Sequence, residues 1–553
     1  EQIALPLPEA LRGSLLLGDA SVERYRIMAV LVGAAVFAAM VWTLNRTKVG
    51  LLIRAGVQDR EMVESLGYRI RRLFVGVFVA GSALAGLGGV MWGMYQQSVV
   101  PQMGAQVNVL IFIVIIIGGL GSTGGALIGA LLVGLVALAF AWLADAAFAS
   151  FKRLLEWAPW SPLLITPLGF TALAYLTQRW FENAKGSGIP QVIAALEMPS
   201  RRLRARLLSL PVAAARMSLT LGALLVGGSV GREGPTVHIG AAVLYSFGRR
   251  LGLHGRRTIA GLVLAGGAAG IAAAFNTPLA GVVFAIEELS RTFEQRFSGL
   301  VLTAVLIGGV VTLGLMGHYA YFGEISGRMP VGWGWSVVPA CAVLGGLLGG
   351  FYAKLVLPTD KGLLGRVCTL RGRYPVRFAA ICGLLLATLG LVSGNHVFGT
   401  GYEETRALLE GQPITDTSFL LWKFLANVAS YLSGIPGGLF SPSLSIGAAF
   451  APLLSLLPDI DPQAGALLGM GAYLAGVTRS PLTASVIVLE LTHSPDLAIP
   501  MLAATLMAAA ISGWVSPVSL YHALAKQITD KLHAAASSST EPAARQPSAT
   551  EKP

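Results

Sequence analysis

No residue between Arg72 and Asp145 carries a formal charge, and this feature limits what the chain can fold into. A helix that crosses a bilayer needs about 20 mostly apolar residues, so the stretch is long enough for more than one crossing. Similar runs recur at 297–317, 337–352, 378–394 and 498–515, and at 207–230 with Arg216 as the one charge. The pattern predicts an all-α, polytopic membrane protein, because helices satisfy their own backbone hydrogen bonds in lipid.

The composition also indicates a lipid environment. Hydrophobic residues make up 54% of the 553 residues and charged residues 12%, whereas soluble domains carry about 25% charged residues. A net charge of +12 would suggest a nucleic-acid partner for a soluble protein, but here basic residues gather in short loops at 201–206, 249–257 and 366–377. Such loops are typical of membrane surfaces. We expect a multi-pass protein of the cell membrane, in bacteria the inner membrane, with no nucleic-acid partner.

The sequence contains no pattern that indicates a bound cofactor. Cys341, Cys368 and Cys382 have neither metal-ligand spacing nor the pattern of a disulfide framework. No nucleotide-binding loop is recognisable. We therefore expect no metal and no other cofactor, and a transporter or channel rather than an enzyme.

The chain changes character near residue 126. Before that point, an apolar span at 27–44 precedes a charged segment whose helical pattern ends near Gly67. The phrases TLNRTKVGLLIRAGVQDREMVESLGYRIRRL and IIIGGLGSTGGALIGALLVG resemble the second half of a branched-chain amino acid permease of an ABC transporter. The resemblance implies that residues 59–67 form the coupling helix that contacts an ATPase subunit. The alternative is an ordinary cytoplasmic loop between two spans.

Only about half of a permease is recognisable in residues 1–125, so this segment is not expected to form a translocation pathway alone. ATPase subunits are expected as partners only if the segment is functional. The stretch 125–140 fits the end of the permease pattern and the first long helix of the region that follows. A genuine gene fusion and an erroneous gene model both predict such a join. The polar tail at 534–553, rich in Ser, Ala and Pro, is predicted to be disordered.

Beyond the join, three motifs rich in Gly and Pro interrupt apolar runs. They are GSGIP at 186–190, GREGP at 231–235 and GGLFSP at 437–442. A helix broken inside a membrane exposes backbone amides, which is tolerated where the break lines a cavity. The N-terminus of a helix carries about half a positive charge and attracts anions. The last two motifs share a G-x-x-x-P frame, which suggests an internal repeat.

Five phrases, in order, resemble those of the CLC family of chloride channels and proton/chloride antiporters. They are GSGIPQV, GREGPTVHIGA, GGAAGIAAAFNTPLAGVVFAIEEL, GGLFSPSLSIGAAF and AGVTRSPLTASVIVLELT. The resemblance covers residues 126–533. It implies two inverted repeats of broken helices in each subunit, and a homodimer with a separate pore in each subunit.

The resemblance also implies the residues that bind chloride. Ser187 matches the serine whose hydroxyl helps to hold the central anion, and serine at this place is typical of chloride-selective members. Tyr521 matches the tyrosine whose phenol donates to the same anion from the opposite side. The remaining contacts are expected from backbone amides, at Leu439 and Phe440 in one broken helix and around Arg232, Glu233 and Gly234 in the other.

Two glutamates are expected to carry protons. Glu233 matches the gating glutamate, which fills an anion site when ionised and swings away when protonated. The alternative is a static pair between Glu233 and Arg232. Glu288 matches the glutamate that passes protons on the inner side of antiporters; by spacing alone Glu287 competes with it, and Glu288 could also be a surface carboxylate.

Two further side chains have no assigned role. Arg216 lies where the family often has a buried lysine, and either a buried or an interfacial position is open. His238 follows the gating motif and is interpreted as structural. Together the motifs predict transmembrane chloride transport, coupled to protons through Glu233 and Glu288. The alternatives are a passive chloride channel of the voltage-gated type, an ABC permease subunit for branched-chain amino acids, and a fluoride exporter, against which Ser187 and Tyr521 argue.

Overall fold

The computed structural model divides the chain by its contacts into two units, Glu1–Phe112 and Ile113–Pro553, which are described separately. The structure describes residues 3–4, 8–17, 20–58, 60–99, 123–198, 200–253, 255–290, 301, 304–309, 311–312, 321–323, 325, 333–359, 362–411, 418–455 and 460–538.

The first unit is built around two long apolar helices, α1 (Arg24–Arg46) and α4 (Ile70–Gln96). Both are long and apolar enough to cross a membrane. They are joined through the short helices α2 (Lys48–Gln58) and α3 (Arg60–Ser65), and the chain turns at Gly67 with a φ of 86°. Small antiparallel pairs join β1 (Ile3–Ala4) to β4 (Ser98–Val99) and β2 (Ser14–Leu17) to β3 (Ala20–Glu23).

The predicted coupling segment at 59–67 therefore contains a helical turn, α3, that ends two residues before Gly67. Asp59 lies outside the described residues. Nothing in the structure tests whether an ATPase subunit contacts this segment, so that assignment stays a prediction.

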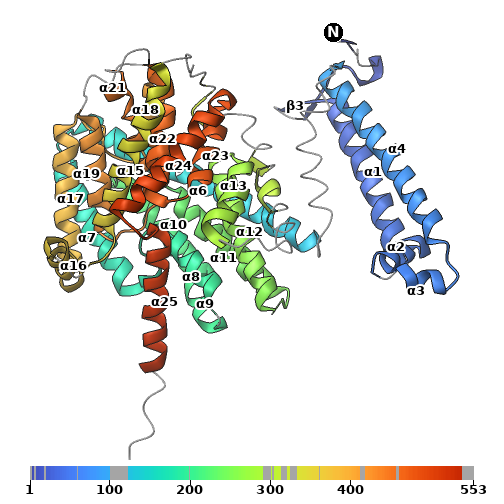
Figure 1. Ribbon diagram of the computed structural model, residues 1–553, viewed down its shortest axis with the longest axis horizontal. Helices are drawn as coiled ribbons and strands as arrows, with labels where there is room; N and C mark the ends of the chain where they lie inside the picture. Colours follow the sequence, from blue (N-terminus) through green and yellow to red (C-terminus); the bar gives the residue numbers. More distant parts are fainter. Residues whose placement is uncertain are drawn as a thin grey trace, which may run out of the picture. The chain divides into compact units, whose positions relative to one another are not determined.

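The second unit is a bundle of helices of unequal length (Figure 1). Its first half comprises α6 (Thr123–Trp157), α7 (Pro162–Trp180), η2 (Glu182–Ala184), α8 (Ile189–Glu197), α9 (Arg201–Leu207), α10 (Leu210–Leu225), α11 (Glu233–Arg250), α12 (Arg256–Phe275), α13 (Pro278–Phe284) and the π-helical turn η3 (Ala285–Ser290). The rest comprises η4 (Trp333–Ser336), α15 (Val337–Val356), α16 (Gly362–Arg373), α17 (Pro375–Val392), α18 (Tyr402–Leu409), α19 (Phe419–Leu432), α20 (Phe440–Ala448), α21 (Ala451–Leu454), α22 (Pro462–Thr478), α23 (Pro481–Thr492), η5 (Pro495–Leu497), α24 (Ala498–Val515) and α25 (Leu520–Ser538).

The all-α, polytopic membrane fold expected from the sequence is confirmed. Eight helices in the described part of the chain are long and apolar enough to cross a membrane. The join predicted near residue 126 falls inside α6. Helix α25 continues to Ser538, so the first residues of the predicted tail at 534–553 are helical, and residues 539–553 lie outside the described part.

Two helices in the centre of the second unit are buried along most of their length, α12 and α22. Glycines bring each of them close to a neighbour. A Cβ on Gly240 of α11 would lie 2.2 Å from the carbonyl oxygen of Gly266 of α12, and a Cβ on Gly447 of α20 would lie 2.4 Å from that of Gly469 of α22. Such small residues let helix backbones approach closely in membranes.

The inverted repeat is visible in a reciprocal pair of helix caps. Glu287, on η3, accepts hydrogen bonds from the amides of Leu482 (3.1 Å) and Thr483 (2.6 Å) at the start of α23. Glu490, on α23, accepts from the amides of Leu279 (3.0 Å) and Ala280 (2.6 Å) at the start of α13. Each half therefore caps the equivalent helix of the other half.

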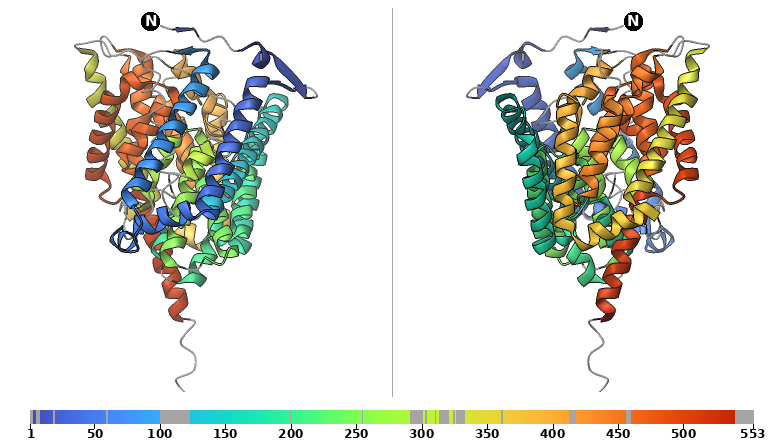
Figure 2. Two further views of the ribbon diagram at one scale, coloured as in Figure 1. Left: turned by 90° about the vertical axis from the view of Figure 1, so that its right-hand side faces the viewer. Right: turned by 90° about the vertical axis from the view of Figure 1, so that its left-hand side faces the viewer.

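The basic loops lie on one side of the second unit. Helices α9, α16 and the far end of α25 lie at the bottom of Figure 1, whereas α18 and α21 lie at the top. Figure 2 shows α25 projecting below the other helices on that same side. Because basic residues favour cytoplasmic loops, we infer that the α25 side faces the cytoplasm.

Candidate functional site

The three motifs rich in Gly and Pro meet in space. The GREGP and GGLFSP motifs are joined by Gly231 and Gly438, whose backbones exchange hydrogen bonds of 2.8 and 2.7 Å. The amide of Gly437 donates to the carbonyl of Gly186, which links GGLFSP to GSGIP (3.3 Å). The N-termini of α8, α11 and α20 are therefore gathered in one place.

Proline and glycine explain why the helices start there. Pro190 and Pro235 lie in the first turns of α8 and α11, where an amide without an intrahelical partner is common. Gly188 precedes α8 with a φ of 103°, a conformation that glycine adopts without strain. The unpaired amides of the first turns make this region electropositive without adding a charged side chain.

The carboxylate of Glu233 lies at the N-terminus of α20. Its Oε1 accepts a hydrogen bond of 2.5 Å from the Ser441 hydroxyl, and its Oε2 lies 3.5 Å from the Ser441 amide. Only 1% of Glu233 is exposed, and the side chain belongs to α11 rather than to α20. A carboxylate therefore occupies the position where the amides of a broken helix would bind an anion.

The side chains of Glu233 and Arg232 do not form the ion pair that was the alternative for Glu233. The Arg232 guanidinium turns to α6, where it donates to the Ala141 carbonyl (2.7 Å) and pairs with Asp145 (2.6 Å). The Arg232 guanidinium is thus held by α6, and binding of an anion by the Arg232 backbone amide stays a prediction.

Ser187 and Tyr521 bring two buried hydroxyls together. Ser187 precedes α8, and Tyr521 lies in the first turn of α25. Both side chains are buried, and neither hydroxyl has a hydrogen-bond partner among the described residues. Buried hydroxyls without partners are costly, so a ligand that accepts from both would be favoured here.

Leu439 and Phe440 place the backbone of α20 beside these hydroxyls. Leu439 is the N-cap residue and Phe440 the first residue of the helix, and both are buried. The Phe440 ring stacks on Tyr521 with centroids 6.3 Å apart and meets Phe284 edge-on at 6.1 Å. The side chains pack in the core while the amides remain at the helix start.

Arg216 is buried behind the GSGIP loop rather than placed at an interface. It donates to the carbonyls of Gly186 (2.7 Å) and Asn183 (2.9 Å). Lys423 has the equivalent place in the second half and donates to the carbonyls of Val397 (2.9 Å) and Gly399 (3.0 Å). Each cation lies fifteen residues before the first glycine of its G-x-x-x-P motif, at 231 and 438. Lys423 was not predicted from the sequence, although this spacing could have identified it.

Glu288 is the interior carboxylate of its pair. It lies on the π-helical turn η3, is 2% exposed, and its Oε2 accepts a hydrogen bond from the Ser480 hydroxyl. Both carboxylate oxygens of Glu287 instead accept hydrogen bonds from amides at the start of α23. The geometry therefore favours Glu288 over its neighbour and excludes a surface position for it. A π-helical turn is frequent at functional sites.

His238 is buried on α11, and its Nε2 lies 2.8 Å from the Leu207 carbonyl. Gly188 packs against it, because a Cβ there would lie 2.9 Å from the His238 Cβ. His238 thus packs through its Cβ against the loop that carries Ser187 and through its ring against the end of α9, which agrees with a structural role.

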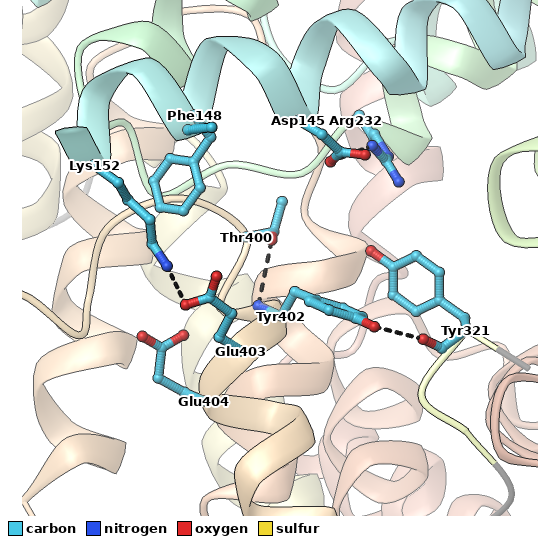
Figure 3. Close-up of a pocket in the computed structure, with 10 residues that line it drawn as sticks. Asp145, Phe148, Lys152, Arg232, Tyr321, Thr400, Tyr402, Glu403 and Glu404 are labelled. Atoms are coloured by element: carbon cyan, nitrogen blue, oxygen red, sulfur yellow. Dashed lines mark hydrogen bonds and ion pairs between the residues drawn. The ribbon is translucent and has the colours of Figure 1, made fainter.

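An outer pocket of about 350 Å³ lies beside Arg232 (Figure 3). Helix α6 lines it with Asp145 and Lys152, and α18 lines it with Glu403, which pairs with Lys152. The sequence analysis did not identify this pocket. Its lining contains two ion pairs, Lys152–Glu403 and Arg232–Asp145, so it does not carry charge of one sign alone.

A repeated pattern could have pointed to the pocket. The loop Gly-Thr-Gly-Tyr at 399–402 resembles Gly-Ser-Gly-Ile at 186–189, and the two glycines of each loop have φ between 62° and 103°. The helix that follows differs, because α18 carries Glu403 and Glu404 in its first turn. Acidic residues there occupy the positive end of the helix and disfavour an anion.

Comparisons with known proteins agree with this geometry. Residues 168–513 match the family model described as voltage gated chloride channel, and residues 12–189 match that of the branched-chain amino acid transport system / permease component. The H(+)/Cl(-) exchange transporter ClcA of Klebsiella pneumoniae subsp. pneumoniae is 33% identical over 411 residues, which cover 69% of this chain and 84% of the relative.

Two solved structures share the fold. A slow cyanobacterial Cl-/H+ antiporter has a TM-score of 0.62 at 24% identity, over 74% of this chain and 98% of that one. A CLC-type fluoride/proton antiporter has a TM-score of 0.60 at 22% identity, over 72% and 96%. The long family match, the curated relative and the meeting of three broken helices lead to one conclusion: the chain belongs to the voltage gated chloride channel family.

Proposed function

We propose that this protein exchanges chloride for protons across the cell membrane. The observation that carries the proposal is the Glu233 carboxylate, which lies within 2.5 Å of the Ser441 hydroxyl at the N-terminus of α20. A carboxylate and chloride are both anions, so they compete for the same helix end. The name of the Klebsiella relative, an H(+)/Cl(-) exchange transporter, supports the same activity.

Competition for one position couples the two ions. When Glu233 is ionised, its carboxylate fills the position at Ser441 and excludes chloride. When Glu233 takes up a proton, the neutral side chain loses its attraction to the positive helix end and leaves the position open. Chloride can then be held by the amides of Leu439 and Phe440 and by the hydroxyls of Ser187 and Tyr521.

Glu288 would exchange the proton on the cytoplasmic side. An ionisable residue inside a membrane segment is a functional candidate by default, and Glu288 is buried with one oxygen bound to Ser480. A buried carboxylate at this place favours an exchanger over a passive channel, because a channel does not need a second proton-bearing group.

We also propose that the protein is a homodimer that pairs through α13, α23 and α24. These helices carry exposed apolar side chains, among them Leu279, Leu482 and Ile499. The helix starts capped by Glu287 and Glu490 lie on the same face, with exposed hydrogen bonds. Polar groups are costly in contact with lipid tails, so a second copy is a better neighbour for this face.

The first unit is proposed to act as a membrane segment with a permease-like surface loop. A role with an ATPase subunit would require a partner that binds near α3. Co-purification of such a subunit with the full chain would support an ABC permease function, and its absence would favour the exchanger alone.

Reconstituted vesicles test the proposed function directly. A chloride gradient should drive protons uphill into the vesicles, and Glu288→Ala should abolish proton flux while chloride flux persists. Chloride movement without uphill proton movement would instead indicate a passive channel. Faster transport of fluoride than of chloride would indicate a fluoride exporter and contradict the assignment of Ser187 and Tyr521.

A further inference from the structure

A histidine lies next to the inner glutamate. His522 follows Tyr521 on α25, and its Nδ1 lies 3.5 Å from Oε1 of Glu288. The two residues are far apart in the sequence and belong to different helical elements. The contact is therefore a product of the fold, and nothing in the motifs predicts it.

The two oxygens of Glu288 have different surroundings. Oε2 accepts a hydrogen bond from the Ser480 hydroxyl, whereas Oε1 has no hydrogen-bond partner among the described residues. Nδ1 of His522 likewise has none in that part of the chain. The free oxygen and the free ring nitrogen thus face each other. Such contacts are often long in the resting protein and tighten when a proton is transferred.

His522 also bridges two environments. Its side chain is 17% exposed, whereas that of Glu288 is 2% exposed. Helix α25 continues from this point to the basic side of the unit, which we have assigned to the cytoplasm. An imidazole ring can accept a proton on one nitrogen and release it again, so His522 can carry a proton between the two environments.

Neighbouring ionisable groups do not offer an equivalent route. Both oxygens of Glu287 are held by the amides of Leu482 and Thr483. Lys185, which precedes α8, interacts with Arg371, Lys531 and Glu182. His522 is therefore the group best placed to connect Glu288 with water.

We propose that His522 is the proton-relay residue between Glu288 and the cytoplasm. This inference rests on the proposed proton exchange. When a proton leaves for the cytoplasm, protonated Glu288 transfers it from Oε1 to Nδ1 of His522, leaving a carboxylate and an imidazolium. The imidazolium then rotates, releases that proton from Nδ1 to cytoplasmic water and returns to the neutral form. The reverse sequence delivers a proton to Glu288.

Fluxes in two backgrounds test the relay. In the otherwise unaltered protein, His522→Asn keeps a similar size but cannot titrate, and it should lower proton and chloride exchange together by about tenfold or more, at an unchanged ratio. In the Glu288→Ala background, chloride flux no longer depends on proton delivery. Adding His522→Asn to this variant should therefore leave its chloride flux unchanged. Added imidazole should partly restore exchange in His522→Ala.

The control is His533→Asn, which removes an exposed histidine from the same helix. It should have no effect on either flux. Wild-type proton flux in His522→Asn would overturn the relay while the proposed function stands. An equal loss of chloride flux in both backgrounds would mean that His522 is structural, which also overturns it. If the unaltered protein moves no protons uphill, the proposed function fails, and the relay fails with it.

Discussion

Gly231 and Gly438 exchange both backbone hydrogen bonds, at 2.8 and 2.7 Å, although they belong to opposite halves of the second unit. This bridge holds the start of α11 against the start of α20. It is the reason that Glu233, which belongs to one broken helix, reaches the N-terminus of the other. The competition between carboxylate and anion thus depends on two glycines that bring two backbones into contact.

The first prediction concerns Gly234, which allows Ser187 to approach α11. A Cβ at this position would lie 2.3 Å from the Ser187 hydroxyl oxygen and 2.8 Å from its carbonyl oxygen. Gly234→Ala should therefore displace the GSGIP loop, abolish chloride transport, and cost about 1–3 kcal/mol of stability. Chloride efflux from vesicles and thermal unfolding measure the two effects. Gly372→Ala is the control, because a Cβ there meets nothing within 4 Å.

The second prediction concerns Ser441, which holds the Glu233 carboxylate. Hydrogen bonds to charged groups contribute about 1.5–3 kcal/mol. Ser441→Ala should therefore lower the equilibrium constant for binding of the ionised Glu233 carboxylate at the start of α20 by about tenfold or more. Chloride should then compete with Glu233 at higher pH than in the unaltered protein. Chloride efflux measured against pH would reveal the shift. An unchanged pH profile would mean that the Ser441 contact does not hold the gate.

Sequence reasoning predicted the meeting of the broken helices for a physical reason. Gly and Pro break helices, and a break inside a membrane is costly unless the freed amides gain a partner, so the GREGP and GGLFSP motifs were expected to line a cavity where helix N-termini bind an anion. The candidate residues Ser187, Glu233 and Tyr521 all lie against the first residues of α11 or α20.

Other features depend on tertiary contacts that no local pattern contains. Glu287 and Glu288 are adjacent in the sequence, and only the position of α23 shows that the first is a cap and the second is interior. The outer pocket pairs Lys152 with Glu403 across hundreds of residues, and its ion pair follows from how α6 and α18 pack. The position of Arg216 was open for the same reason.

The third prediction concerns the reciprocal caps. Glu490→Ala leaves the amides of Leu279 and Ala280 without their acceptor and should cost about 1 kcal/mol or more of stability. Glu490→Gln retains one acceptor oxygen and should cost less. Because the halves are equivalent, Glu287→Ala should have a similar effect to Glu490→Ala. Thermal unfolding in detergent measures all three, and a neutral Glu490→Ala would refute the role of the cap.

The fourth prediction concerns Lys185, which lies in the loop before α8, outside the spanning helices. Burial, and then the positive charges of Arg371 and Lys531, lower the pKa of Lys185 from 10.5 to about 8. The amine is therefore about nine-tenths charged at pH 7 and about one-tenth charged at pH 9. Because a cation before Ser187 attracts anions, this contribution to chloride affinity should be present below pH 8 and lost above it.

Lys185→Met isolates that contribution. At pH 7 the variant should bind chloride more weakly than the unaltered protein, whereas at pH 9 the two affinities should converge, because the Lys185 amine of the unaltered protein is then mostly neutral. Equilibrium chloride titrations at the two pH values measure the difference. Equal affinities at pH 7 would mean that the Lys185 charge is neutralised by Glu182, which also faces it. A Glu182→Gln background separates these cases, since with that carboxylate removed Lys185→Met should weaken chloride binding at pH 7.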